Sequence, residues 1–217
     1  MKKNIKYLIE KHINFDVTDY SEDEDELMSS QEVEKYITMP KSRDELCQLI
    51  AKRYELNPEY PYLLDIDTSQ ITNMSGVFCP IFNNGILEGN IYLNKYLFPS
   101  RSLKVKALDL STWDTSNVTD MSNMFWAAGE RYLEEINISS FDTSNVTKMD
   151  GMFGFLSALK TLDLSKFDTS KVIKMNSMFS NCESIRELDL SNFDTSKVIN
   201  MYAMFRECFN LVSLNKA

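Results

Sequence analysis

The stretch "LDLSNFDTSKVINMYAMF", Leu188 to Phe205, recurs along the chain in nearly the same letters. Further copies begin at Leu162, Ile136 and Leu108, and a shorter copy, "IDTSQITNMSGVF", begins at Ile66. The Asp of the Asp-Thr-Ser triplet therefore recurs after 47, 28, 26 and 26 residues. A regular period in this range is typical of solenoids, in which each repeat stacks on its neighbours.

The letters within one repeat predict its local structure. In "LKTLDLSKFDTSKVIKMNSMF", which begins at Leu159, Leu162 and Leu164 alternate with polar residues, as in a strand with one buried face. The second half has apolar residues at relative positions 0, 3, 6 and 7, which predicts one face of a short helix. These residues are Val172, Met175, Met178 and Phe179. We therefore predict an α/β leucine-rich-repeat solenoid, with a short parallel strand and a short helix in each rung of about 26 residues.

Residues that every repeat shares are expected to be scaffold, because a catalytic group is needed only once. The Asp-Thr-Ser triplet begins at Asp67, Asp114, Asp142, Asp168 and Asp194, and we expect it to cap the helices. Nine of the twelve methionines lie in the repeats, and we expect them in the core rather than in an adaptable binding groove. Cys182 and Cys208 share one repeat position, which favours buried thiols over a disulfide or a metal pair. Without a C-x-x-C pair, a reduced, cytoplasmic chain is expected.

The chain divides into two regions. Residues 1–65 are predicted to form an N-terminal segment with an acidic linker, Asp19 to Glu26, and a helical cap. The helix is predicted over "KSRDELCQLIAKR", residues 41–53, because Ser42 and Glu45 form a capping box before an apolar face. Residues 66–217 are predicted to form the repeat array, with an insert at about 79–106.

Two features of the array suggest interactions. The insert contains Tyr92, Tyr96 and Phe98, which either anchor a partner or fill the space of a degenerate repeat. After the last repeat, Leu211 and Leu214 begin another strand without a capping helix. A strand of this kind can pair with another chain, so a homodimer through the C-terminal strand is predicted.

Composition excludes several classes of function. The formal net charge of −9 argues against direct nucleic-acid binding, which needs a basic face. No apolar run approaches the roughly 20 residues that span a bilayer, and charged residues interrupt the N-terminal segment that resembles a signal peptide. His12 is the single histidine, and no catalytic, metal or cofactor motif is present. No enzymatic activity, metal or cofactor is predicted.

Function is expected where the repeats face water and differ. On the predicted strand face, two columns carry Asp109, Glu135, Thr161, Asp163, Glu187 and Asp189. Because neighbouring strands lie about 4.8 Å apart, these residues form an acidic ribbon, which is either a solvated face or a docking stripe for a basic partner. A hydrolase that uses Glu187 and Asp189 is disfavoured, since an open ribbon has no pocket to shift a pKa.

The repeated phrase L-x-x-L-D-L-S-x-F-D-T-S-x-V-T-x-M-x-x-M-F resembles the BspA-like leucine-rich repeat family of bacterial and mycoplasmal proteins, over residues 66–214. The resemblance implies a leucine-rich solenoid that binds proteins without enzymatic activity. A surface adhesin is one form of this function. Since the sequence lacks the signal peptide and lipid-anchor cysteine of surface members, an intracellular or phage-borne inhibitor is another. It would block a nucleic-acid-binding protein by placing carboxylates where phosphates lie.

Overall fold

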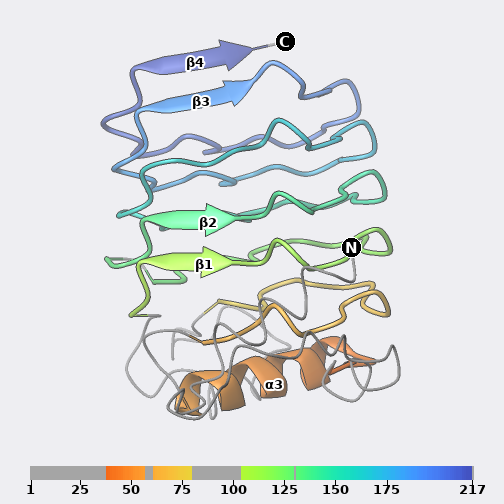
Figure 1. Ribbon diagram of the computed structural model, residues 1–217. Helices are drawn as coiled ribbons and strands as arrows, with labels where there is room; N and C mark the ends of the chain where they lie inside the picture. Colours follow the sequence, from red (N-terminus) through yellow and green to blue (C-terminus); the bar gives the residue numbers. More distant parts are fainter. Residues whose placement is uncertain (1–37, 57–60, 80–103, 130, 217) are drawn as a thin grey trace, which may run out of the picture.

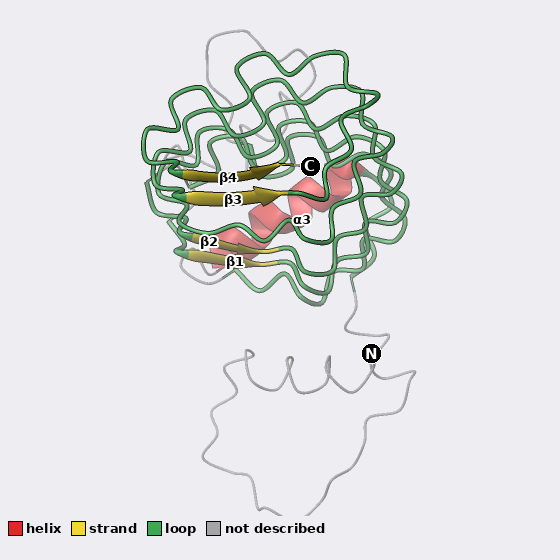
Figure 2. Ribbon diagram, turned by 90° about the horizontal axis from the view of Figure 1, so that it is seen from above, coloured by secondary structure: helices red, strands yellow, loops and turns green. Residues whose placement is uncertain are grey.

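The computed structural model describes residues 38–56, 61–79, 104–129 and 131–216. In these residues the chain winds into stacked coils, with the helix α3 (Arg43–Leu56) beneath the first of them (Figure 1). Seen from above, the coils overlie one another and the strands run in the same direction (Figure 2). We number the coils 1 (61–79), 2 (104–129), 3 (131–156), 4 (157–182) and 5 (183–208), and residues 209–216 begin a further turn.

Short parallel strands lie above one another on one side of the stack. β1 (Ala107–Asp109) pairs with β2 (Glu135–Asn137), and β3 (Glu187–Leu190) pairs with β4 (Ser213–Lys216). The strands are in phase, so that leucine or isoleucine lies opposite its counterpart and points into the core. Side chains on either side of it point outward, as the two-residue period of a strand requires.

A second ladder joins all five coils on another side of the stack. It consists of single parallel bridges that run through Asn73, Asp120, Lys148, Lys174 and Asn200. Beyond this column, every second backbone N–H of one coil donates to a carbonyl of the next. The N–H groups of Asn123 and Phe125, for example, donate to Asp150 O and Met152 O at 2.7 and 2.9 Å.

The prediction of a short helix in each rung is wrong. Residues 121–128 instead form consecutive tight turns, in which the Met124 N–H donates to Met121 O and the Ala128 N–H to Phe125 O, three residues back. Asn123 and Ala127 have φ angles of 54° and 56°, the left-handed conformation that the third position of a type II turn requires. The assignment of this stack to the leucine-rich-repeat class stays a prediction.

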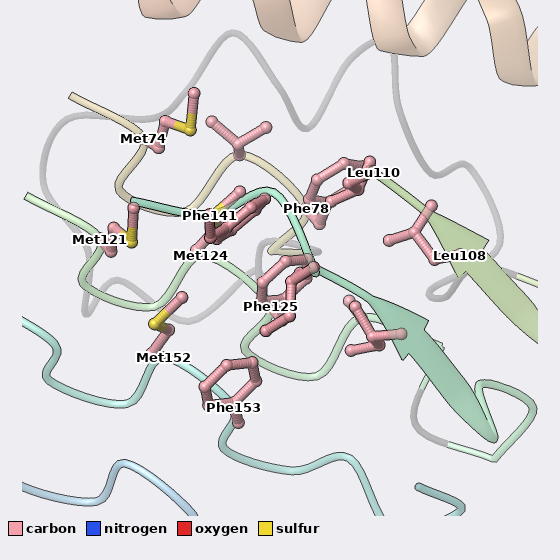
Figure 3. Packing of buried hydrophobic residues seen from close by; sticks show 14 of the residues in the cluster. Met74, Phe78, Leu108, Leu110, Met121, Met124, Phe125, Phe141, Met152 and Phe153 are labelled. Carbon is pink, nitrogen blue, oxygen red and sulfur yellow. The ribbon is translucent and has the colours of Figure 1, made fainter. Parts of the chain in front are cut away.

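Most of the residues predicted to face inward do so. Val172, Met175, Met178 and Phe179 are all fully buried. Five phenylalanines stack along the axis with centroids 5.4–5.7 Å apart and planes within 7° of parallel; they are Phe78, Phe125, Phe153, Phe179 and Phe205. Figure 3 shows the first three of them. The exceptions are Met201, which is 47% exposed, and four residues that are only half-buried: Leu162, Val198, Phe205 and Cys208.

The predicted helical segment, residues 41–53, is helical from Arg43 and continues to Leu56. Ser42 Oγ accepts a hydrogen bond from the Glu45 N–H at 3.2 Å, and Glu45 Oε2 accepts one from the Lys41 N–H at 2.8 Å. The helix therefore starts with the predicted capping side chains, although Glu45 reaches one residue further back than a capping box requires. Leu46 and Ile50 are fully buried and belong to the same core as the coils.

The Asp-Thr-Ser triplet is scaffold, but it stabilises turns rather than helix ends. Each Asp accepts a hydrogen bond from the N–H of the Ser two residues on, at 2.8–2.9 Å. In the first four copies the Thr is buried, and its hydroxyl donates to a backbone carbonyl of the next coil. Thr143 Oγ1 donates to Asp168 O at 2.9 Å and accepts from the Asp168 N–H at 2.8 Å. One hydroxyl thus satisfies two backbone groups of its neighbour.

We expect Thr143→Val to lower the free energy of unfolding by about 1–3 kcal/mol, because valine keeps the shape and leaves the partly buried N–H and C=O of Asp168 without the hydroxyl that binds both. Urea denaturation followed by circular dichroism measures the change. The matched control is Thr195→Val, in the same local sequence, since Thr195 is exposed and its hydroxyl has no hydrogen bond among the described residues. Equal losses in the two variants would contradict a structural role for the bridging hydroxyl.

A tryptophan lies against two glycines on the turn side of coils 2 and 3. The Trp126 ring packs against Phe155 at a tilt of 49°, with centroids 4.7 Å apart. A Cβ on Gly151 or Gly154 would approach Trp126 Cε3 to 2.6 or 2.5 Å, which is closer than real contacts. Gly151 also has a φ of +60°, whereas Gly154 does not need a left-handed conformation. Glycine is therefore needed at position 154 only because a side chain there would overlap the indole ring.

Gly154→Ala is expected to destabilise the protein by about 1–3 kcal/mol, because the added methyl group overlaps the indole ring. In a Trp126→Ala background the same change should cost at least about 1 kcal/mol less, since the two approaches below 3.0 Å are both to the indole ring and the next, to Ser177 O, is 3.3 Å. A double-mutant cycle from chemical denaturation measures this coupling. The same cost in both backgrounds would show that the indole is not what excludes a side chain.

Candidate groove on the strand face

A groove of about 1120 Å³ runs along the strand face from coil 3 to the strand after coil 5. It is lined by Glu135, Ile136, Asn137, Lys160, Thr161, Leu162, Asp163, Ser184, Arg186, Glu187, Leu188, Asp189, Asn210, Ser213 and Asn215. These residues come from strands and from the segments just before them. The parallel stacking therefore places residues about 26 positions apart side by side.

The groove lies where the sheet is interrupted. Glu135 in β2 pairs with Thr161 of coil 4, but no backbone hydrogen bond among the described residues joins 160–164 to β3. Figure 1 shows this as a segment without an arrow between β2 and β3. Side chains tie the two coils at either end of the interruption. Ser184 Oγ donates to Ser157 O at 2.6 Å, and Asn192 Nδ2 donates to Leu164 O at 3.0 Å.

The interruption explains why Leu162 is half-buried rather than buried as predicted. On the turn side, coils 4 and 5 remain joined through the backbone, as in the bond from the Phe179 N–H to Met204 O at 2.9 Å. The two coils are therefore linked on one side and separated on the other. On its strand side, coil 4 therefore has backbone groups that make no hydrogen bond to β3 in the described residues. Leu162 is only half-buried there, whereas Leu108, Ile136 and Leu188 at the same position are buried.

Most of the residues predicted to bind a partner meet in this groove. Glu135, Thr161, Asp163, Glu187 and Asp189 all line it. Asp109 lies in β1 opposite Asn137, on the same face but outside the lining of the groove. The other three predicted residues, Tyr92, Tyr96 and Phe98, lie outside the described residues.

Each aspartate of the strand face is held by a local turn. Asp109, Asp163 and Asp189 accept hydrogen bonds through Oδ1 from the N–H two residues on, at 2.9–3.0 Å. The bond from the Ser165 N–H lowers the pKa of Asp163, and hydrogen bonds from Ser191 lower the pKa of Asp189. Both carboxylates are therefore ionised at neutral pH and fixed in direction.

Asn137 occupies the same column and makes the same turn. Its Oδ1 accepts from the Ser139 N–H at 3.2 Å. Because an amide oxygen replaces a carboxylate oxygen here, the turn does not require the charge. The charge of the other aspartates is thus available for a partner.

Two cations of the groove were missed by the sequence analysis. Lys160 and Arg186 lie in the column next to Thr161 and Glu187. Lys160 Nζ donates to Glu134 Oε2 at 2.5 Å, and this bond lowers the pKa of Glu134. The predicted acidic ribbon is therefore a mixed surface, with four carboxylates and two cations in the lining. Comparing the repeats one column earlier, at Lys106, Glu134, Lys160 and Arg186, would have found these residues.

The described residues contain no group of three or more histidine, cysteine or acidic side chains placed to hold a metal ion. The four cysteines are free thiols, and Cys182 Sγ donates to Phe153 O at 3.1 Å. Burial raises the pKa of Cys182 and of Cys208, which keeps both protonated at neutral pH. In the part of the chain that is described, no helix has the length and apolar character to cross a bilayer.

Comparison with known proteins places the repeats in a family. No curated protein and no solved structure matches the chain. A family described as "Mycoplasma protein of unknown function, DUF285" matches residues 55–128 and 93–215, which together include all five coils. The chain therefore belongs to the DUF285 family of mycoplasma proteins of unknown function.

Proposed function

We propose that this protein is a non-enzymatic protein-binding module whose strand-face groove holds an extended basic segment of a partner. The observation that carries the proposal is the coincidence of the groove with the interruption between coil 4 and β3. In the described residues, the backbone groups that elsewhere join neighbouring strands make no such bonds there. An extended partner segment can bind such groups through its own main chain, with its side chains giving specificity.

The charges of the groove favour a basic partner. Asp163, Glu187 and Asp189 lie on two neighbouring coils around the interruption. The aspartates are already fixed by their turns, so little side-chain freedom is lost when a cation binds. Complementary charge of this kind speeds association and selects among partners.

Arg186 adds selectivity to this surface. It lies beside Glu187 and has no ion pair among the described residues. A uniformly basic segment would meet repulsion at this point, so the preferred partner carries a polar or acidic side chain opposite Arg186. A surface that mimics nucleic acid would carry negative charges alone, like a row of phosphates. Because the groove also contains Lys160 and Arg186, we favour a protein-docking role over mimicry of nucleic acid.

The repeat phrase supports the same proposal. Its resemblance to the BspA-like leucine-rich repeats implies a solenoid that binds proteins, and stacked repeats generally present extended binding surfaces. We propose that the coils are a leucine-rich-repeat variant in which turns replace the helices. A surface adhesin and a phage-borne inhibitor remain alternative settings for the same groove.

The test removes the charge of the groove without altering its shape. Asp163→Asn, Glu187→Gln and Asp189→Asn are combined, because Asn137 shows that asparagine keeps the turn. The matched control combines Asp114→Asn, Asp142→Asn and Asp168→Asn, which removes the same charge from exposed turns in the Asp-Thr-Ser column. Tagged wild type and both variants are incubated with extract of the native cell, and captured proteins are quantified by mass spectrometry.

We expect the wild type and the control to capture at least one protein in common. The amount of this protein captured by the groove variant should be lower by roughly tenfold or more. Its binding should weaken as salt rises, because the contact is partly electrostatic. Equal capture by both variants would overturn the groove as the site. Displacement of the captured protein by nucleic acid would instead favour the inhibitor.

A further inference from the structure

The charge of the groove changes sign along the strands of the two coils that flank the interruption. Lys160 and Arg186 lie at equivalent positions of coils 4 and 5, and we call them the cationic column. Asp163 and Asp189 follow three residues later and form the aspartate column. Because residues of a strand advance by about 3.3 Å each, about 10 Å of strand separates the two columns. Along the stack, in contrast, each column keeps one sign from coil 4 to coil 5.

Neighbouring groups balance these charges only in part. Lys160 pairs with Glu134 at 2.5 Å, but Arg186 has no ion pair among the described residues. The two aspartates are held by hydrogen bonds to their own turns. Coil 4 lies between coils 3 and 5, and coil 5 is followed by the strand β4. The exposure of both columns is therefore a property of the strand face, because each coil has a described neighbour on either side.

A half-buried leucine lies between the two columns. Leu162 lines the groove two residues after Lys160 and one residue before Asp163. Its counterparts on the neighbouring coils, Ile136 and Leu188, are buried. Covering the exposed part of Leu162 removes apolar surface from water, which favours binding. Coil 4 thus offers an apolar contact between a basic and an acidic group.

An extended segment laid along the strands matches these three features in one register. Alternate side chains of such a segment point to the same face and lie about 7 Å apart. An acidic side chain over the cationic column places the next one of that face over Leu162. The one after it lies about 3 Å beyond the aspartate column, within reach of a lysine or arginine. A segment that crosses the strands would meet only one sign of charge in each column.

We propose that the partner segment carries an acidic, an apolar and a basic side chain at alternate positions, and that it lies along the strands with its acid toward Arg186 and its base toward Asp163 and Asp189. This inference rests on the proposed function, since it describes the segment that the groove holds. The segment is basic overall, because four carboxylates and two cations line the groove. Either chain direction satisfies the pattern, because side chains carry it.

The test measures the binding of fluorescein-labelled peptides to the full 217-residue chain by fluorescence anisotropy. The pattern peptide is Thr-Glu-Thr-Leu-Thr-Arg-Lys-Thr, and a second peptide has the same residues in reverse order. In the matched control of each, the glutamate and the arginine move one position toward the leucine. The composition is then unchanged, but in an extended peptide both charges point away from the face that carries the leucine.

A charge exchange in the protein tests the placement of the acid. Arg186→Glu introduces the residue that the same column carries at Glu134 in coil 3, so the backbone is compatible with it. Its control, Lys197→Glu, makes the same change in net charge at an exposed position outside the groove lining. A further peptide, in which lysine replaces the glutamate of the pattern, is the complementary ligand for Arg186→Glu.

At least one of the two orders is expected to bind the wild type roughly fivefold or more tightly than its control peptide. Arg186→Glu should weaken this binding roughly fivefold or more and should strengthen binding of the lysine peptide. Lys197→Glu should change either by less than about twofold. Equal binding of the pattern and control peptides, no binding at millimolar concentration, or an unchanged preference in Arg186→Glu overturns the inference.

The two proposals fail in different experiments. If only the side-chain pattern is wrong, the captured protein is still lost when the charges of the groove are removed, and the groove remains the binding site. Capture that is unchanged in the groove variant removes the site on which the pattern rests, whatever the peptides do.

Discussion

Hydrogen bonds between successive coils are the constraint on which the structure depends. On the turn side, every second N–H of a coil donates to the carbonyl above it, and the intervening N–H groups close turns within their own coil. Backbone groups buried beneath side chains cannot bind water, so this alternation satisfies them without a helix or an extended strand. It also sets the repeat length, since each coil must bring the same residue above its predecessor. The columns of methionine, phenylalanine and threonine follow from that register.

The stacking could be predicted from the sequence, whereas the path within each coil could not. Burial at relative positions 0, 3, 6 and 7 is what a helix produces, and consecutive turns produce the same spacing because their inward residues also recur after three or four positions. Gly76, Asn123 and Gly151, at the third position of the turns, are the local signal for turns, since glycine and asparagine adopt positive φ readily. Coils 4 and 5 have Ser177 and Ala203 at that position, and neither residue type indicates a turn with positive φ.

The candidate groove was partly predictable for a related reason. The repeat spacing predicted that Glu135, Asp163 and Glu187 lie close together, and all three line the groove. In a parallel stack, the repeat length alone decides which residues are neighbours on adjacent coils. The interruption beside Leu162 could not be predicted, since coils 4 and 5 carry nearly the same letters in their strands. Whether two such strands pair depends on how the segments before and after them are held, here by Ser184 and Asn192. That is a property of packing rather than of local sequence.

The equivalence of Asp163 and Asn137 in the strand-face turns has a wider consequence. Either residue supplies the oxygen that closes the turn, so each coil can be anionic or neutral at this position with the same backbone. Recognition and foldability are therefore uncoupled at these sites. A set of such proteins could share one architecture and still discriminate among ligands, through single-residue differences that leave the melting temperature nearly constant.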